Sequence, residues 1–146
     1  MARKCDKLFT TWQTVSGGSY ANQVAAYDLG TKTWSAPTTL PAPPYTMDNH
    51  GSMALSIDED GYIHLVGGPH HQALLHTVST NPCDVSIFQA YVDVHPSGGL
   101  FTYSSTVHDL YDQLHVATRY RTSSEWSLAM IRRNAAGTWS PIDPIL

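Results

Sequence analysis

The chain carries an internal repeat with a period of about 50 residues. Residues 62–66 read YIHLV and residues 113–117 read QLHVA, which places His64 and His115 51 positions apart. The string KTWS at residues 32–35 is matched by GTWS at residues 137–140, 105 positions later and close to two such periods. A chain built on a repeat of this length folds as an array of similar units, each packed against its neighbours.

Each unit has the pattern of a four-stranded antiparallel meander. The chain is rich in Thr, Ser, Val, Tyr and Trp, and it has ten glycines, nine prolines and only 14% charged residues, as is typical of all-β proteins. Residues 50–68 predict a hairpin around the turn DEDG, and further strands are expected at residues 73–78 and 87–94. A four-stranded meander repeated at this period indicates a β-propeller blade, with a β-sandwich as the alternative.

The repeat also suggests how the chain is divided. We expect a flexible N-terminus at residues 1–11 and a β-propeller-like domain at residues 12–146. Within it, residues 12–44 form a partial blade, residues 45–95 one blade and residues 96–146 another. The prediction is an all-β, partial β-propeller of about two and a half blades, whereas closed propellers typically have at least about four. Either the chain is a piece of a longer protein or copies self-associate to cover the open blade edges.

Charge and cysteine content narrow the classes of partner. No Lys or Arg occurs between Lys32 and Arg119, whereas eight Asp or Glu do, so we expect no nucleic-acid partner. No apolar run is long enough for a membrane span, and the basic start lacks the apolar core of a signal peptide. The two cysteines, Cys5 and Cys83, form either a disulfide or two free thiols.

Four polar side chains are expected at one mouth of the propeller channel. The first strand of a blade lines the channel and the second returns beside it, so the start of one and the end of the other share an edge. His50 and Tyr103 begin the first strands of two blades, and His70 and Arg119 end the second strands. Converging polar groups at a concave mouth indicate a binding site.

The strings that carry these residues resemble a known family. They are DNHGSMALSIDEDGYIHLVGGPH from residue 48, FTYSSTVHDLYDQLHVATRYR from residue 101 and GTWSP from residue 137. In this order they resemble the BNR-repeat proteins that include the ulvan lyases, which are polysaccharide lyases built as seven-bladed propellers. The resemblance covers residues 27–139 and implies β-elimination at a uronic acid of an acidic, ulvan-like polysaccharide.

The resemblance places the family's catalytic pattern on His50, His70, Tyr103 and Arg119. A guanidinium suits this chemistry because it stabilises the negative charge that builds on the uronate carboxylate. A neutral imidazole can take the proton and a tyrosine hydroxyl can return one to the departing oxygen. We assign His50 as the base, Tyr103 as the acid and His70 as a positioning group, with the first two roles exchangeable.

Arg121, His71 and Asn49 are expected to bind substrate beside these four residues. Arg121 also competes with Arg119 for the catalytic role, because a strict 51-residue register pairs it with His70. His50, His70 and His71 offer metal ligands, but no HxH or HExxH spacing supports a catalytic metal. We therefore expect neither a catalytic metal nor an organic cofactor, with a structural metal ion as the alternative.

Other prominent side chains are expected to serve the fold. Trp34 and Trp139 recur at the same point of the repeat and Trp126 opens a strand, so all three are predicted to pack in the core. His64 and His115 occupy matching mid-strand positions and are expected between blades. The acidic turn at residues 58–60 is expected to be a solvated hairpin tip.

The sequence thus favours a polysaccharide lyase-like protein whose partner is an acidic polysaccharide. One alternative is a propeller module that binds an acidic glycan without cleaving it. The other is a structural protein that pairs through its exposed blade edges. The family resemblance suggests secretion, although the chain shows no signal peptide.

Overall fold

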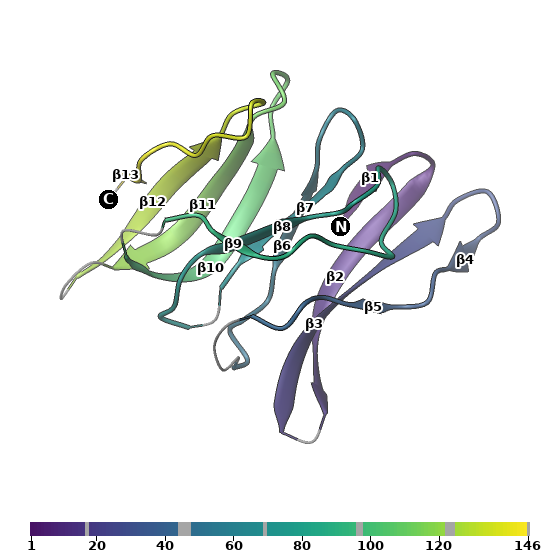
Figure 1. Ribbon diagram of the computed structural model, residues 1–146, viewed down its shortest axis with the longest axis horizontal. Helices are drawn as coiled ribbons and strands as arrows, with labels where there is room; N and C mark the ends of the chain where they lie inside the picture. The colour runs from purple at the N-terminus through teal and green to yellow at the C-terminus, as the bar shows by residue number, and fades with distance from the viewer. Residues whose placement is uncertain (17, 44–47, 69, 96–97, 122–124, 146) are drawn as a thin grey trace.

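Three antiparallel sheets stand side by side in the computed structural model of this chain, with the second sheet between the other two (Figure 1). The structure describes residues 1–16, 18–43, 48–68, 70–95, 98–121 and 125–145. Within these residues all the regular structure is β-strand, and no helix that could cross a membrane occurs there. The three sheets are blades of a partial β-propeller, which confirms the predicted fold class.

The sheets follow one another along the chain, and every strand pairing is antiparallel. The first sheet comprises β1 (Ala2–Lys4), β2 (Lys7–Ser16), β3 (Ser19–Asp28), β4 (Thr33–Trp34) and β5 (Thr38–Thr39). The second comprises β6 (Ala54–Ile57), β7 (Ile63–Gly67), β8 (Leu75–Val78) and β9 (Val92–Asp93). The third comprises β10 (Leu100–His108), β11 (Leu114–Arg121), β12 (Trp126–Arg133) and β13 (Asp143–Pro144).

Residues 1–11, for which the sequence predicted a flexible N-terminus, belong to the first sheet. These residues form β1 and the first half of β2, and the side chain of Phe9 is completely buried against the second sheet. A disulfide between Cys5 and Cys83 joins the turn after β1 to the second sheet and settles the state of the two cysteines. The first blade therefore begins earlier in the chain than the sequence indicated.

The central strand β7 belongs to both hydrophobic cores of the molecule. Ile63 and Leu65 face the first sheet and pack with Phe9 and Val24, whereas Val66 faces the third sheet and packs with residues such as Phe101. Side chains on a strand alternate between its faces, so a strand sandwiched between two blades is buried on both faces. This placement explains why the run IHLVG is buried throughout.

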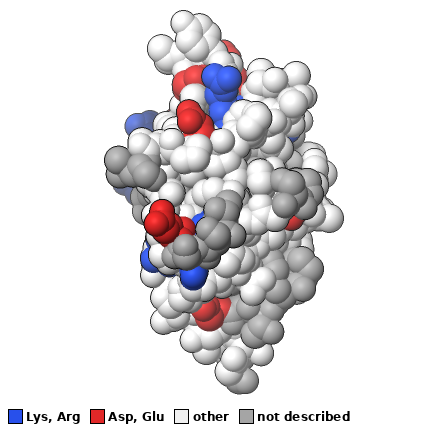
Figure 2. Space-filling model, turned by 90° about the vertical axis from the view of Figure 1, so that its left-hand side faces the viewer, with Lys and Arg blue, Asp and Glu red and all other residues white. Residues whose placement is uncertain are grey.

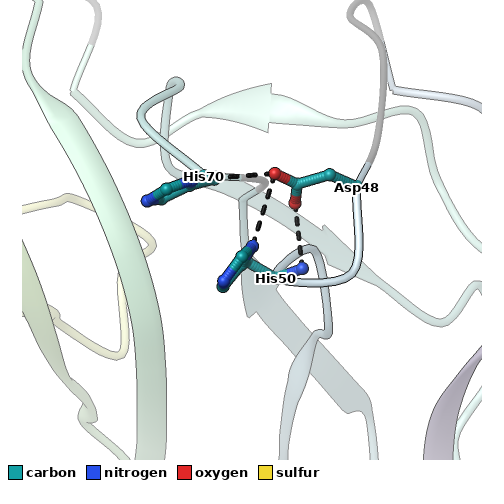
Figure 3. Close-up of side chains that lie close together, drawn as sticks. All are labelled: Asp48, His50 and His70. Carbon is teal, nitrogen blue, oxygen red and sulfur yellow. Dashed lines mark hydrogen bonds and ion pairs between the residues drawn. The ribbon is translucent and has the colours of Figure 1, made fainter.

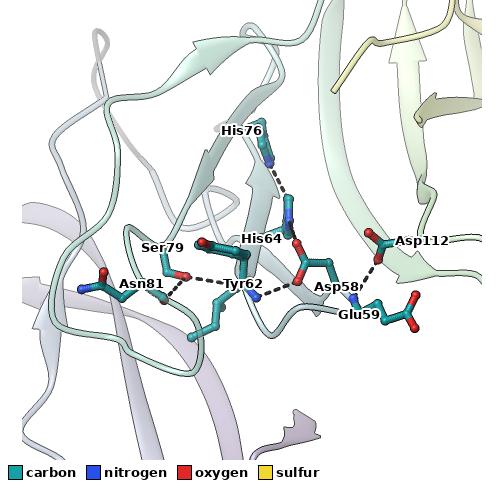
Figure 4. A network of polar contacts seen from close by, with 9 residues as sticks. Asp58, Glu59, Tyr62, His64, His76, Ser79, Asn81 and Asp112 are labelled. Carbon is teal, nitrogen blue, oxygen red and sulfur yellow. Dashed lines mark hydrogen bonds and ion pairs between the residues drawn. The ribbon is translucent and has the colours of Figure 1, made fainter. Parts of the chain in front are cut away.

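A buried polar network closes the hairpin between β6 and β7 (Figure 4). The carboxylate of Asp58 accepts a hydrogen bond from the backbone N–H of Tyr62 and lies 3.1 Å from Nε2 of His64. On the other side of the His64 ring, Nδ1 lies 2.9 Å from Nε2 of His76. His64 is almost fully buried, as expected. Asp58, however, is a structural partner of His64 and not part of a solvated tip, because a buried imidazole needs a hydrogen-bond partner.

The third sheet repeats the same hairpin closure. Asp109 accepts a hydrogen bond from the backbone N–H of Gln113, and its Oδ2 lies 2.8 Å from His115 Nε2. His115 is partly exposed, so the expectation that it lies buried between blades is not met.

The outer side of this sheet carries few charged residues among many uncharged ones, as the view from the third sheet shows (Figure 2).

Candidate active site

The loop before β6 presents Asp48 and His50 at one end of the second sheet. The carboxylate of Asp48 accepts a hydrogen bond of 2.9 Å from the backbone N–H of His50, which is a local turn that Asp favours. The first sheet fixes this loop from the other side. Gln13 of β2 donates to the carbonyl of Asp48, and the buried Asn22 of β3 donates to the carbonyl of Gly51, both at 2.8 Å.

His70 and His71 follow β7 and complete this side of the site. Their rings lie against each other, with centroids 3.8 Å apart, and the ring of His70 stacks on that of His50 at 4.4 Å. The next residue, Gln72, pairs with Phe101 of β10, which ties this loop to the third sheet. The second and third blades are therefore joined beside the histidines.

Tyr103 reaches the site through an irregularity in β10. The pairing of β10 with β11 shifts between Thr102 and Ser105, and Tyr103 has a positive φ of 59°. Such a φ is uncommon for a residue other than glycine, and a bulge redirects side chains away from the regular alternation. As a result Tyr103 is 56% exposed, and its ring centroid lies 5.7 Å from that of His50.

Arg119 of β11 lies between two aromatic rings. Its guanidinium carbon is 4.8 Å from the centroid of Tyr103 and 4.2 Å from that of Trp126. Arg121 approaches the same Trp126 ring at 5.3 Å, and His71 packs on it at 4.7 Å. Trp126 is thus partly exposed and holds two cations at the site, so the expectation that it belongs to the core is wrong.

The four side chains expected at the channel mouth meet in the structure. His50 contacts His70 and Tyr103, and Tyr103 contacts Arg119, so second and third blades contribute two residues each. Of the three expected binding residues, Arg121 and His71 border the cluster through Trp126. Asn49 lies exposed in the turn before His50.

Asp48 is a residue of this site that the sequence analysis did not single out. Its Oδ2 lies 3.4 Å from His50 Nδ1 and 3.7 Å from His70 Nδ1 (Figure 3). Partial burial alone would raise the pKa of the Asp48 carboxyl, but the backbone N–H and ring of His50 outweigh burial and leave that pKa below its usual value. A carboxylate shared by two imidazoles orients both rings, and the motif D-N-H was the available signal.

The site brings two arginines, Arg119 and Arg121, near a single carboxylate, that of Asp48. The pKa of His71 is lowered by desolvation and by the nearby His70, Arg119 and Arg121. A group of cations opposite one carboxylate favours an anionic ligand. Asp48, His50 and His70 are also the described residues whose ligand atoms lie close enough together to hold a metal ion, all within 4.8 Å of one another.

The sequence profile of the BNR repeat-containing family matches residues 7–144. The chain belongs to this family. The match runs from the start of β2 in the first sheet to the end of β13 in the third.

Two curated relatives are similar to parts of this BNR-repeat chain. The ulvan lyase of Alteromonas sp. (strain LOR) is 28% identical over 106 residues, which cover 58% of this chain and 21% of the relative. The protein named Ulvan Lyase-PL25 of Pseudoalteromonas sp. (strain PLSV) is 32% identical over 75 residues, covering 41% of this chain and 15% of the relative. The matched parts are thus only about a fifth or less of each relative.

Solved structures of PL25 ulvan lyase share the fold. One of them, described as bound to -[GlcA(1-4)Rha3S]-, superposes with a TM-score of 0.77 at 20% identity, covering 99% of this chain and 36% of the lyase. A second structure of PL25 ulvan lyase gives the same values. The chain therefore has the fold of about one third of such a lyase.

Proposed function

We propose that this BNR-repeat chain is a polysaccharide lyase that cleaves a uronate-containing, ulvan-like glycan by β-elimination. The observation that supports it is the contact of His50, His70, Tyr103 and Arg119 at one end of two neighbouring blades. Two imidazoles, a phenol and a guanidinium within one cluster supply a base, an acid and a charge stabiliser for a single reaction. The relatives named above are ulvan lyases, in keeping with this chemistry.

Arg119 is proposed to bind the uronate carboxylate. Removal of the proton at C5 of the sugar spreads negative charge onto that carboxylate, and a guanidinium held in place stabilises the charge as it forms. The two rings that flank Arg119 restrict its motion, so little reorganisation is needed during the reaction. An arginine pairs with a carboxylate through two parallel hydrogen bonds, which also orients the sugar.

His50 is proposed as the base and Tyr103 as the acid. The imidazole takes the C5 proton, the electron pair forms the C4–C5 double bond, and the C4–O bond breaks. The phenol gives its proton to the departing glycosidic oxygen, so the protein gains one proton and releases one. The two rings are adjacent, which also fits the exchanged assignment, in which Tyr103 takes the proton.

His70 is proposed to position the uronate, since it stacks on His50 and shares Asp48 with it. Arg121, His71 and Asn49 border the cluster and are proposed to bind neighbouring sugars or their sulfates. Arginine suits sulfate because its planar fork matches the anion's oxygens. The site as described uses no organic cofactor in these steps.

The experiment is to incubate the folded protein with ulvan, and separately with polymers that lack uronate, while following near-ultraviolet absorbance. β-Elimination creates a conjugated unsaturated uronate that absorbs there, so we expect a rise with ulvan alone. Retardation of ulvan in an affinity gel without any rise would instead support a glycan-binding module. Neither effect, in a sample that runs as a defined oligomer, would support an assembly protein.

A further inference from the structure

Three potential metal ligands converge beside the proposed base. They are Oδ2 of Asp48, Nδ1 of His50 and Nδ1 of His70, and the same carboxylate oxygen approaches both rings (Figure 3). The other ring nitrogens of the two histidines point away from Asp48 in this view. All three side chains are partly exposed, so an ion could reach the group from solvent.

The spacing of these atoms does not suit direct hydrogen bonds. Nitrogen to carboxylate hydrogen bonds span about 2.7 to 3.2 Å, whereas the two separations here are 3.4 and 3.7 Å. His50 Nδ1 is buried and has no hydrogen-bond partner among the described residues. In the pair of Asp109 and His115, by contrast, Oδ2 and Nε2 lie 2.8 Å apart, which suits a direct hydrogen bond.

The same spacing suits a shared metal ion. Zinc bonds of about 2.0 to 2.1 Å in tetrahedral geometry place neighbouring ligand atoms roughly 3.3 Å apart. The two separations from Asp48 Oδ2 are close to this value, and all three ligand atoms lie within 4.8 Å of one another. Two imidazoles and one carboxylate form a ligand set that zinc and similar divalent transition metals accept, with a fourth position open.

We propose that Asp48, His50 and His70 form a binding site for a divalent transition metal of the zinc class, and that the metal inhibits the proposed lyase. A neutral imidazole that binds metal through Nδ1 carries its hydrogen on Nε2. His50 then has no free lone pair with which to take the sugar proton. Without metal, a hydrogen on Nδ1 faces Asp48 and leaves Nε2 free to act as the base. Only the inhibition rests on the proposed function, and the metal site stands on the geometry alone.

The binding test is a titration of the metal-free protein with Co²⁺ followed by its visible spectrum, and with Zn²⁺ by calorimetry. We expect one ion per chain, with the stronger absorption of a cobalt site of low coordination number. The variant Asp48→Asn should weaken binding at least about tenfold, because loss even of an outer partner of a ligand costs that much. Asp109→Asn is the matched control and should bind as the wild type does. Equal binding by wild type and Asp48→Asn would overturn the site.

The inhibition test adds Zn²⁺ to the ulvan reaction and then removes it with a chelator. We expect the rate to fall along the same Zn²⁺ titration that fills the site and to recover after chelation. A filled site with an unchanged rate would overturn the inhibition. If no lyase activity exists, the proposed function fails, but the cobalt spectrum still decides the metal site.

Discussion

At the scale of single residues, the candidate site depends on contacts within the third sheet and between this sheet and the second. Arg119 is held between Tyr103 and Trp126, and Tyr103 is exposed because the bulge in β10 turns it toward His50. Both rings therefore restrict the position of the guanidinium.

Replacing Arg119 with lysine should lower the rate of uronate elimination by about 100-fold or more, because the loss of one positioned charge stabiliser costs this much. Lysine keeps the charge but lacks the planar fork and the stacking on the two rings. Steady-state kinetics on ulvan measure the change. Arg132→Lys, at an exposed position of β12, is the control and should keep the wild-type rate. Equal rates for both variants would show that Arg119 has no part in the reaction.

Replacing Trp126 with leucine should lower kcat/KM by roughly 2- to 30-fold, since one cation–π contact contributes about 0.5 to 2 kcal/mol. The loss arises because the Arg119 side chain is less restricted, and not because the fold is weaker. The unfolding temperature should therefore change little. Trp34→Leu serves as the control because Trp34 is half exposed and packs on Tyr27, in the first sheet. A similar loss in both variants would point to a general effect on folding.

The sequence predicted that four residues of the candidate site lie together, but not the contacts between them. His50, His70, Tyr103 and Arg119 were found because the repeat and the family strings place them at strand ends. Trp126 was misassigned, because a tryptophan at a strand start has the same sequence pattern whether it packs in the core or lies partly exposed against cations. Asp48 was overlooked, since an Asp before a strand usually caps a turn, and here it also faces two histidines.

At the scale of elements, the hairpin between β6 and β7 was predictable and its polar closure was not. Alternation of Met53, Leu55 and Ile57 with small residues marks the strand, and Gly61 marks the turn. The alternation of apolar and small residues cannot reveal that Asp58 pairs with His64, because this contact forms only when the hairpin folds. Similarly, β1 is too short and polar to give a strand signal.

Three histidines packed between the second and third sheets should make stability fall in acid. Burial lowers the pKa of His64, that of His76 to about 3 and that of His108 to about 4. In the unfolded chain their pKa is 6.5, so below that value the unfolded state binds more protons and stability falls with pH. The full stability from this source is present above pH 6.5.

Between about pH 6 and pH 5 the free energy of unfolding should drop by roughly 2 kcal/mol, if His76 and His108 each contribute about 1 kcal/mol over this interval. Urea unfolding at a series of pH values measures it. In His108→Gln the dependence should become shallower. Stability that stays constant or rises over this interval would contradict the burial of these histidines.

At the scale of the whole molecule, the three blades are joined by two cores and one disulfide. The cores lie on the two faces of the second sheet, and the Cys5–Cys83 disulfide links the first sheet to the second across 78 residues. The first sheet in turn anchors the loop that carries Asp48 and His50. Its attachment to the second sheet therefore also supports the site.

The double variant Cys5→Ser, Cys83→Ser should unfold with a free energy about 4 kcal/mol lower, as expected for opening a loop of this length. Denaturant unfolding of both proteins gives the difference, and treatment of the wild type with a reductant should reproduce it. If the double variant and the reduced wild type both unfold at the midpoint of the untreated wild type, the disulfide contributes nothing to stability.

The central claim is that one cluster from two blades catalyses β-elimination, and the mass of the products tests it most directly. Folded protein is incubated with ulvan and the released oligosaccharides are weighed by mass spectrometry. Elimination predicts a new end that is lighter by one water molecule than the product of hydrolysis. Products with the mass of hydrolysis, or no products from folded protein, would contradict the account.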